Sequence, residues 1–312
     1  MVIKIASALI FLGLSVVGFA RDQFDSVERK LLLEAKEGGA KSQYLLGVLY
    51  SDPMFRRVNL EQAVSWYEKA TRNGSMEAAC DLWNLNLKSD WQGRSSEKAL
   101  YWIKKASEGN APCGWYGLAL MNEKGIAMEK NVGMAFSLYK RAAEAGDARS
   151  QINLAAMYLN GKGVPANEEL SLYWIRKAAD QGDPIGLFKY GSHLLSTKEK
   201  ASRHEAVNLF RRSLAKGNVM AAGSLGFVYA NGALVEKNTI LAYALFDFLN
   251  EANNNISVDE DVMLQMRDMG RKAKDQLEAG MSKSEINRGD FISDELKSSQ
   301  DILKTLDKYA KQ

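Results

Sequence analysis

Cysteine and histidine are scarce in this sequence of 312 residues, which contains two of each. Neither His193 nor His204 lies at metal-ligand spacing from a cysteine or a carboxylate pair, so we expect no metal site. The sequence also lacks a Gly-Lys-Ser phosphate loop and a G-x-S-x-G nucleophile motif. These absences argue against a cofactor and against an enzyme.

Blocks of like charge are absent as well. Without Lys4, which lies in the first 20 residues, 40 basic residues face 38 acidic ones and the net charge is +2. Such a balance argues against a nucleic acid or a membrane surface recognised through charge. A hydrophobic content of 46% fits a folded chain rather than a disordered one.

The only long apolar run is at the N-terminus. Residues 1–20 read MVIKIASALIFLGLSVVGFA, with a charged Lys4, an apolar stretch, and Gly18 and Ala20 at the positions that precede a cleavage site. This pattern predicts a signal peptide cleaved after Ala20 and a periplasmic or secreted protein that does not span a membrane. The alternative is an uncleaved anchor, although the apolar run is short for a membrane span.

Glycine recurs along the rest of the chain with a period close to 36 residues. The recurring positions are Gly38, Gly74, Gly109, Gly146, Gly182 and Gly217, separated by 36, 35, 37, 36 and 35 residues. Between them, apolar residues recur at helical spacing on both sides of a turn such as NGKGVPAN (160–167). This pattern predicts helical hairpins that bury their apolar faces against one another, with the recurring glycines as left-handed helix ends.

Small residues form further columns in the repeats. Gly47, Ala155, Gly191 and Gly226 occupy one position of the first helix, with Gly117 one place early, and we expect a close helix contact there. The chain divides into residues 1–20, an N-terminal capping helix at 21–38, six repeats at 39–254, and C-terminal capping helices with a polar tail at 255–312. The turns of the second and fifth repeats depart most from the pattern.

These columns resemble the Sel-one-like repeat (SLR) family, a relative of the tetratricopeptide repeats. The matching segments are LLGVLY (45–50), AVSWYEKA (63–70), NGKGV (160–164), YWIRKAADQG (173–182) and SLGFVYANG (224–232). The resemblance implies an all-α fold, a right-handed superhelical solenoid of antiparallel helix pairs. It also implies a scaffold that binds another protein on a concave face lined by the first helix of each repeat.

Six tryptophans divide into two groups. Trp66, Trp102 and Trp174 share one column and are predicted to be core residues. Trp83, Trp91 and Trp115 lie outside that column, so they are either anchors of a protein interface or local repacking of irregular repeats. On the first helices, which the resemblance places along the concave face, Tyr44, Asn153 and Lys189 are further candidates for partner binding.

Cys80 and Cys113 lie on the first helices of the second and third repeats. In an exported protein two cysteines suggest a disulfide. Packed helices are, however, about 8–10 Å apart from axis to axis, which exceeds ordinary disulfide reach. Both a disulfide and two buried free thiols therefore remain possible.

We interpret the chain as an exported, non-enzymatic scaffold that binds a protein partner. The resemblance suggests an immunity protein that neutralises a periplasmic antibacterial toxin. One alternative is a periplasmic regulator or assembly adaptor of an envelope sensor or secretion system. An alternative of another class is a hydrolase of cell-wall or β-lactam amides, which would need a nucleophile and a base that the sequence does not reveal.

Overall fold

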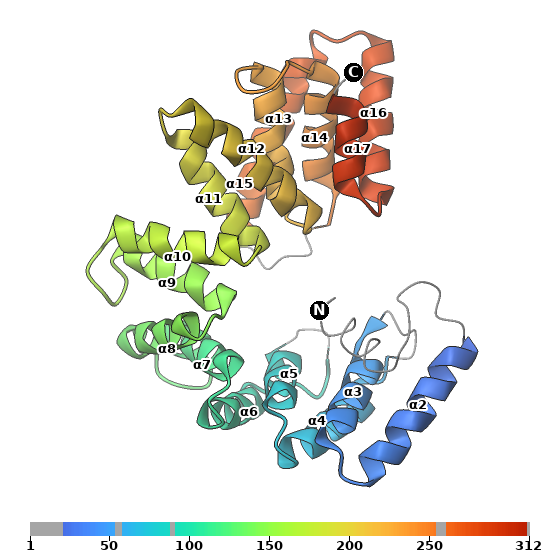
Figure 1. The fold of residues 1–312 in the computed structure, drawn as a ribbon, viewed down its shortest axis with the longest axis vertical. Helices are drawn as coiled ribbons and strands as arrows, with labels where there is room; N and C mark the ends of the chain where they lie inside the picture. The colour runs from blue at the N-terminus through green and yellow to red at the C-terminus, as the bar shows by residue number, and fades with distance from the viewer. Residues whose placement is uncertain (1–20, 54–57, 88–90, 254–259, 311–312) are drawn as a thin grey trace. The chain divides into compact units, whose positions relative to one another are not determined.

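The computed structural model of the protein describes residues 21–53, 58–87, 91–253 and 260–310, and these residues form helices and turns with no strand. Six first helices alternate with six second helices (Figure 1). The first helices are α3 (Ala40–Ser51), α5 (Met76–Leu87), α7 (Pro112–Lys124), α9 (Ala148–Asn160), α11 (Pro184–Ser196) and α13 (Met220–Asn231). The second helices are α4 (Leu60–Arg72), α6 (Ser96–Glu108), α8 (Val132–Glu144), α10 (Glu168–Asp180), α12 (Lys200–Ala215) and α14 (Thr239–Glu251). The fold is a helical repeat solenoid, which confirms the predicted class. The predicted signal peptide, residues 1–20, lies outside the described residues.

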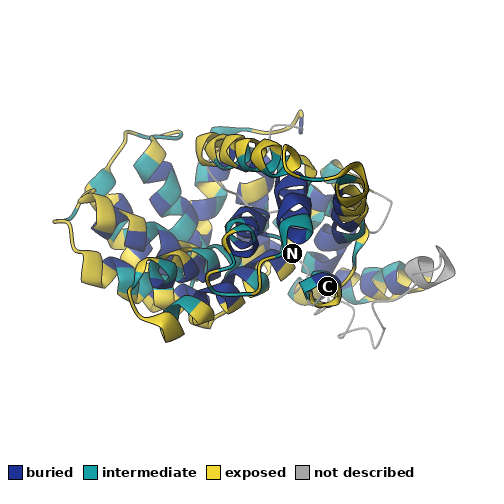
Figure 2. Ribbon diagram, turned by 90° about the horizontal axis from the view of Figure 1, so that it is seen from above, coloured by how far each residue is buried: buried dark blue, intermediate teal, exposed yellow. Residues whose placement is uncertain are grey.

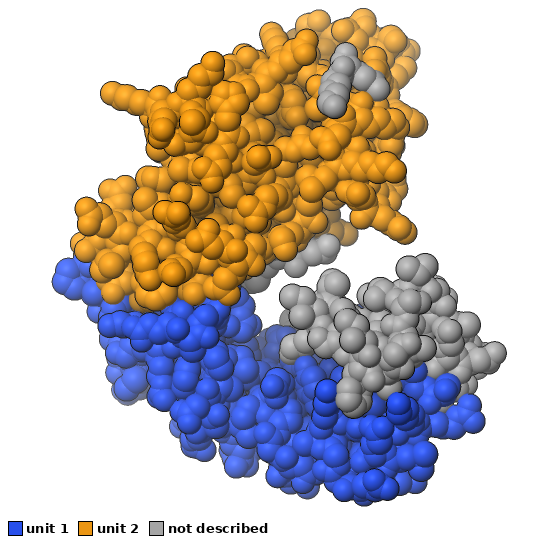
Figure 3. All heavy atoms as spheres, in the orientation of Figure 1, with its two compact units in different colours: residues 1–150, 162–165 blue, residues 151–161, 166–312 orange. Residues whose placement is uncertain are grey.

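The chain separates into two compact units. Unit 1 contains residues 1–150 and 162–165, and unit 2 contains residues 151–161 and 166–312 (Figure 3). Within each unit the buried residues form stripes along the helices, and polar residues occupy the opposite sides (Figure 2). This is the arrangement that the helical spacing of the apolar residues predicts.

Two recurring backbone features set the length of the repeats. Five of the six recurring glycines, Gly38, Gly74, Gly146, Gly182 and Gly217, have φ between 75° and 96°, as predicted for left-handed helix ends. The sixth prediction is wrong, because the left-handed residue beside Gly109 is Asn110, with φ of 59°. Asparagine tolerates this conformation better than most residues do.

The second feature is a column of N-cap residues on the second helices. Asn59, Ser95, Asn131, Asn167 and Asn238 each accept a hydrogen bond from the backbone N–H three residues later. A side-chain cap of this kind satisfies one of the donors that the helix leaves unpaired. The column repeats with the same period as the glycines, so it starts five of the six second helices at a fixed place in the repeat, and α12, whose N-cap Glu199 makes no side-chain cap hydrogen bond, is the exception.

Helix α2 (Arg21–Lys36) lies in the segment 21–38, for which a capping helix is predicted. Its Val27, Leu31 and Ala35 are buried in a cluster with apolar residues of α3. At the other end, α15 (Glu260–Glu278) presents exposed Gln265, Asp268 and Lys272 on the side opposite its buried residues. Such a polar side lets a repeat array end in water.

The end of the chain differs from the predicted polar tail. It forms α16 (Lys283–Ser298), which starts with the predicted Ser282–Glu285 capping box, and α17 (Ile302–Ala310). Leu306 and Tyr309 of α17 are buried, and Asp307 pairs with Arg211 of α12. The apolar side chains of this charged segment are few, but they suffice to pack α17 on the second helices of unit 2.

Helix α14 is the most enclosed helix of unit 2, with nine consecutive buried residues from Leu241 to Leu249. One of them is Asp247, whose Oδ1 lies 2.5 Å from Nζ of Lys274 on α15. Burial raises the pKa of Asp247, but the hydrogen bond and charge of Lys274 and the charge of Lys297 outweigh it, so this pKa lies below its ordinary value. The two lysines come from α15 and α16, so Asp247 links both capping helices to the last repeat.

The predicted close contact at Gly226 is present, and it supports a first testable prediction. A Cβ atom added at Gly226 would lie 2.8 Å from Cε1 of Phe246, a fully buried residue. We expect Gly226→Leu to lower the free energy of unfolding by about 1–3 kcal/mol, because the leucine overfills the contact between α13 and α14. Chemical denaturation measures the loss, and hydrogen exchange locates it on these two helices.

Gly133→Leu is the matched control for this prediction. Gly133 lies on α8, and an added Cβ would meet only Oδ1 of Asn131, at 3.7 Å. This variant is expected to unfold at the same denaturant concentration as the parent. Equal midpoints for the Gly226 and Gly133 variants would show that the contact at Gly226 is misplaced.

Candidate functional site

The core of the first, fifth and sixth repeats pairs a glycine on the first helix with a large aromatic residue on the second helix. An added Cβ at Gly47 would lie 2.4 Å from the buried ring of Tyr67, and one at Gly191 would lie 3.1 Å from the buried ring of Phe210. The small first-helix column predicted from the sequence therefore faces a large second-helix column. Because this pairing buries the large residues of the second helices, the aromatic residues at the surface must come from other positions.

Trp83 reverses this pairing in the second repeat. The tryptophan replaces glycine on α5, and the facing residue on α6 is Ile103 rather than a tyrosine or phenylalanine. The neighbouring helix also leaves room, because a Cβ at Gly117 would lie 3.0 Å from Cε2 of Trp83. Trp83 is 7% exposed, so it is a packing residue, and the absence of a side chain at Gly117 compensates for its size.

Trp91 and Trp115 are buried too, at 9% and 7% exposure. Trp91 belongs to the core cluster that contains Tyr67 and Leu82, and Trp115 is covered by the guanidinium of Arg141, 4.1 Å from its ring. Of the two alternatives for these tryptophans, this burial favours local repacking of the irregular repeats. Residues that carry little exposed area offer little surface to a partner.

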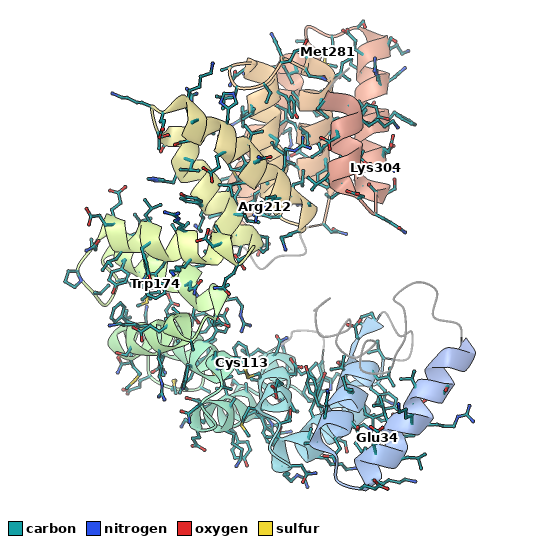
Figure 4. The ribbon with its side chains drawn as sticks, in the orientation of Figure 1. Glu34, Cys113, Trp174, Arg212, Met281 and Lys304 are labelled. Atoms are coloured by element: carbon teal, nitrogen blue, oxygen red, sulfur yellow. A yellow bond between two sulfur atoms is a disulfide. The ribbon has the colours of Figure 1, made fainter. Side chains whose placement is uncertain are left out.

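The regular tryptophan column is less buried than predicted. Trp66, Trp102 and Trp174 are half-buried; Trp174 is labelled on α10 in Figure 4. Trp102 and Trp174 each pack edge-on against the preceding tyrosine, with ring centroids 4.7 Å and 5.0 Å apart. The core position is the next residue along the helix, for example Tyr67 or Ile103. The periodicity therefore predicts the correct side of the helix, but the most buried position is one residue later than predicted.

Tyr44 and Tyr116 are partly exposed aromatic residues on the first helices of unit 1. Together with Glu77, Asp81 and Arg149 they form what we call the first-helix surface of unit 1. All five side chains are half-buried or exposed, and they come from α3, α5, α7 and the first turn of α9.

Tyr44 is held between neighbours on two helices. Its ring lies 5.9 Å from that of Tyr67, and its hydroxyl is hydrogen-bonded to Asp81. Burial, followed by the charges of Asp81 and Glu77, raises the pKa of Tyr44 well above its ordinary value. The tyrosine therefore stays a neutral hydrogen-bond donor, fixed in direction by a carboxylate from the next repeat.

Tyr116 is held in a similar way on α7. The guanidinium of Arg149 lies 4.1 Å from the centre of its ring, and Arg149 is fixed by Asp147, 2.8 Å away. The ring of Trp83 meets Tyr116 edge-on, with a centroid distance of 6.0 Å. Burial raises the pKa of Tyr116 although the charge of Arg149 lowers it. The surface thus presents two aromatic side chains whose orientations are set before any partner binds.

The other two predicted contact residues belong to unit 2. Asn153 of α9 is half-buried, and Lys189 of α11 is exposed. Tyr44 belongs to unit 1, and the two units are described separately. Their role in partner binding stays a prediction.

The two cysteines form a disulfide that joins α5 to α7. The Cα atoms of Cys80 and Cys113 are 6.1 Å apart (Figure 4, near the label of Cys113). The expected distance of 8–10 Å was wrong for the cysteines because it applies to helix axes, whereas Cα atoms lie about 2.3 Å from each axis and can face each other across the gap. Next to it, Gly114 packs against α6, where an added Cβ would lie 2.3 Å from the backbone nitrogen of Ser107.

Two further properties concern the described part of the chain. Its helices include none with the length and apolar character needed to cross a membrane. Its histidine, cysteine, aspartate and glutamate side chains form no group of three suited to holding a metal ion.

Comparison with known protein families gives a match along much of the chain. The model of the Sel1 repeat matches residues 40–75, 86–110, 116–147, 148–183 and 219–249. No match covers α12, in the fifth repeat, whose turn is among the irregular ones in the sequence.

Comparison with solved structures gives the same fold. A protective antigen with an SLR fold from uropathogenic Escherichia coli superposes with a TM-score of 0.68 at 24% identity, over 91% of this chain and 57% of that chain. A Sel1 repeat protein from Oxalobacter formigenes has a TM-score of 0.61 at 20% identity, over 80% of this chain and 95% of that one. An immunity protein from Pseudomonas aeruginosa has a TM-score of 0.46 at 22% identity, over 77% of this chain and 82% of that one, which is too low to support an inference about function.

Proposed function

Because this chain belongs to the Sel1 repeat family, whose members are scaffolds for protein interactions, we propose that it binds a protein partner through the first-helix surface of unit 1. The observation that carries the proposal is the fixed orientation of Tyr44 and Tyr116 by Asp81 and Arg149. Tyrosine and arginine are enriched at the centres of protein interfaces, and rigid side chains lose little entropy on binding. Members of the family are generally non-catalytic, so binding is preferred to the hydrolase alternative.

We also propose that binding takes place outside the cytoplasm. The N-terminal 20 residues have the pattern of a signal peptide, and the Cys80–Cys113 disulfide suits an oxidising compartment. These two features together support the proposal of a periplasmic or secreted location.

Within this proposal, the partner is an antibacterial toxin and the chain is its immunity protein. The choice of an immunity protein rests on the resemblance to the Sel-one-like repeat family, which suggests this role for an exported member. It requires that the captured partner be toxic when expressed alone in the periplasm and harmless when expressed with this chain. A partner that proves to be part of an envelope sensor or secretion system would replace immunity with the adaptor alternative.

A second testable prediction concerns the two tyrosines. Proteins captured from periplasmic extract by the parent should be lost when Tyr44→Ala and Tyr116→Ala are combined, since truncating a central interface residue commonly costs about 2 kcal/mol or more. Quantitative mass spectrometry of the captured material measures the loss. Thermal unfolding of the same variant shows whether the fold is kept.

Tyr101→Ala provides the matched control. Tyr101 is 54% exposed on α6, a second helix of the same unit. Capture should be unchanged in this variant. Equal loss of the same proteins from Tyr101→Ala would contradict the assignment of binding to the first helices.

A further inference from the structure

The last described helix, α17, is held in unit 2 by polar contacts to three other helices (Figure 1). Its Asp307 pairs with Arg211 of α12. On α16, Glu295 accepts a hydrogen bond of 2.5 Å from the hydroxyl of Tyr309. The backbone carbonyl of Tyr309 accepts a hydrogen bond of 2.9 Å from Nδ2 of Asn238, the N-cap residue of α14. We call the surface of α12, α14 and α16 that carries Arg211, Asn238 and Glu295 the α17 site.

One side of α17 is apolar and faces the core of unit 2. At 3.6 residues per turn, Ile302, Leu306 and Tyr309 lie within about 60° of one another around the helix. Leu306 and Tyr309 are buried in the core cluster that also contains residues of α12 and α14. Lys304, labelled in Figure 4, lies on the opposite side of the helix and is exposed. The α17 site therefore accepts an amphipathic helix with apolar residues at positions i, i+4 and i+7.

Helix α17 depends on this docking for its own stability. It has 9 residues, and isolated helices shorter than about 12–15 residues are marginal in water. Only residues 299–301 connect it to α16, and it belongs to none of the six helix pairs of the repeats. Release of α17 therefore uncovers the α17 site and leaves the helix pairs packed, which makes it a local opening rather than an unfolding of unit 2.

From these observations we propose that the α17 site is a second docking surface, which binds an amphipathic helix of another protein when α17 leaves it. The helix that occupies the site defines the chemistry of this partner: apolar side chains at positions i, i+4 and i+7, and an acidic residue that pairs with Arg211. Helix α17 is then an internal competitor, because the apparent affinity for a partner falls with the fraction of molecules in which the site is open. The site belongs to unit 2, so it can fail without the first-helix surface of unit 1.

Fluorescence anisotropy with a labelled peptide of residues 299–312 tests the proposal on the full mature chain. A chain that combines Leu306→Ala with Tyr309→Ala should bind the peptide, because its own α17 is held loosely. The parent should bind the peptide roughly tenfold or more weakly than this variant does, because its α17 occupies the site. Lys304→Ala is the matched control, since Lys304 is exposed, and it should behave as the parent does. Equal binding by the parent and the double variant would overturn the proposal, as would a double variant that does not bind.

Variants of the peptide test whether the site recognises the pattern of α17. A peptide with Leu306→Ala and Tyr309→Ala should bind the double variant roughly tenfold or more weakly than the unchanged peptide does. A peptide with Asp307→Lys should bind about two- to fivefold more weakly, and adding Arg211→Glu to the chain should restore its binding. Binding that ignores the apolar side chains of the peptide would overturn the proposal, because it would show unspecific association.

Hydrogen exchange of the parent tests the opening without any substitution, so it applies even if the double variant fails to fold. Amides of α17 should exchange faster than those of α16, because the opening releases α17 alone. Equally slow exchange in both helices would overturn the proposal, since the site would then open only when unit 2 unfolds. Dimers of the parent that the double variant does not form would show exchange of α17 between copies and would replace the partner helix with a second copy of this chain.

Discussion

Trp115→Ala is expected to lower the free energy of unfolding by about 3–5 kcal/mol, because it removes a large side chain from a closed site. Trp115 is 7% exposed, and Arg141 covers its ring while bonding to Asn110 at 2.9 Å. The alanine variant loses the buried area and leaves the guanidinium without its aromatic surface. Urea denaturation of the parent and the variant measures the difference.

Trp174→Ala is the comparison for this prediction. Trp174 is half-buried on α10, so its truncation should cost only about 1–2 kcal/mol, in proportion to the area it removes from water. Sequence periodicity alone predicts the opposite order, with Trp174 in the core. A larger loss for Trp174→Ala than for Trp115→Ala would contradict the burial that the structure assigns.

This contrast shows where prediction from the sequence succeeds and fails. The glycine period predicts the repeats because each repeat ends at the same position in the left-handed conformation, which glycine adopts readily. The size of a core residue is harder to predict, because it depends on its partner on another helix. Trp83 fits because Ile103 is smaller than Tyr67, the corresponding residue of the first repeat, and because Gly117 has no side chain.

The candidate surface was predicted only in part for a similar reason. Tyr44 was identified because the resemblance places first helices on the binding face. Tyr116 was not identified, since its significance depends on Arg149, which lies 33 positions later and reaches back over its ring. The N-cap column was visible as four asparagines and one serine with the repeat period, and that signal could have placed the start of every second helix except α12.

Loss of the Cys80–Cys113 disulfide is the second large expected effect. The bridge closes a loop with a sequence separation of 33, and a loop of this length predicts a loss of about 3–4 kcal/mol when Cys80→Ala and Cys113→Ala are combined. The bridge constrains the unfolded chain, so the loss should appear mainly as easier unfolding of unit 1. Denaturation of the variant beside the parent measures it.

The parent under reducing conditions provides the control for this variant and should show a similar loss. Thiol titration of the native protein should detect no free thiol before reductant is added, because the sequence has no other cysteine. Two titratable thiols in the native protein would contradict the disulfide. They would also remove one of the two supports for a location outside the cytoplasm.

The most direct test of partner binding is photocrosslinking in living cells. A photoreactive phenylalanine analogue replaces Tyr116, on the first-helix surface of unit 1, or Tyr101, exposed on a second helix of the same unit. The account predicts a specific protein adduct from position 116 and none from position 101. An adduct from position 101 with none from position 116 would contradict binding by the first helices.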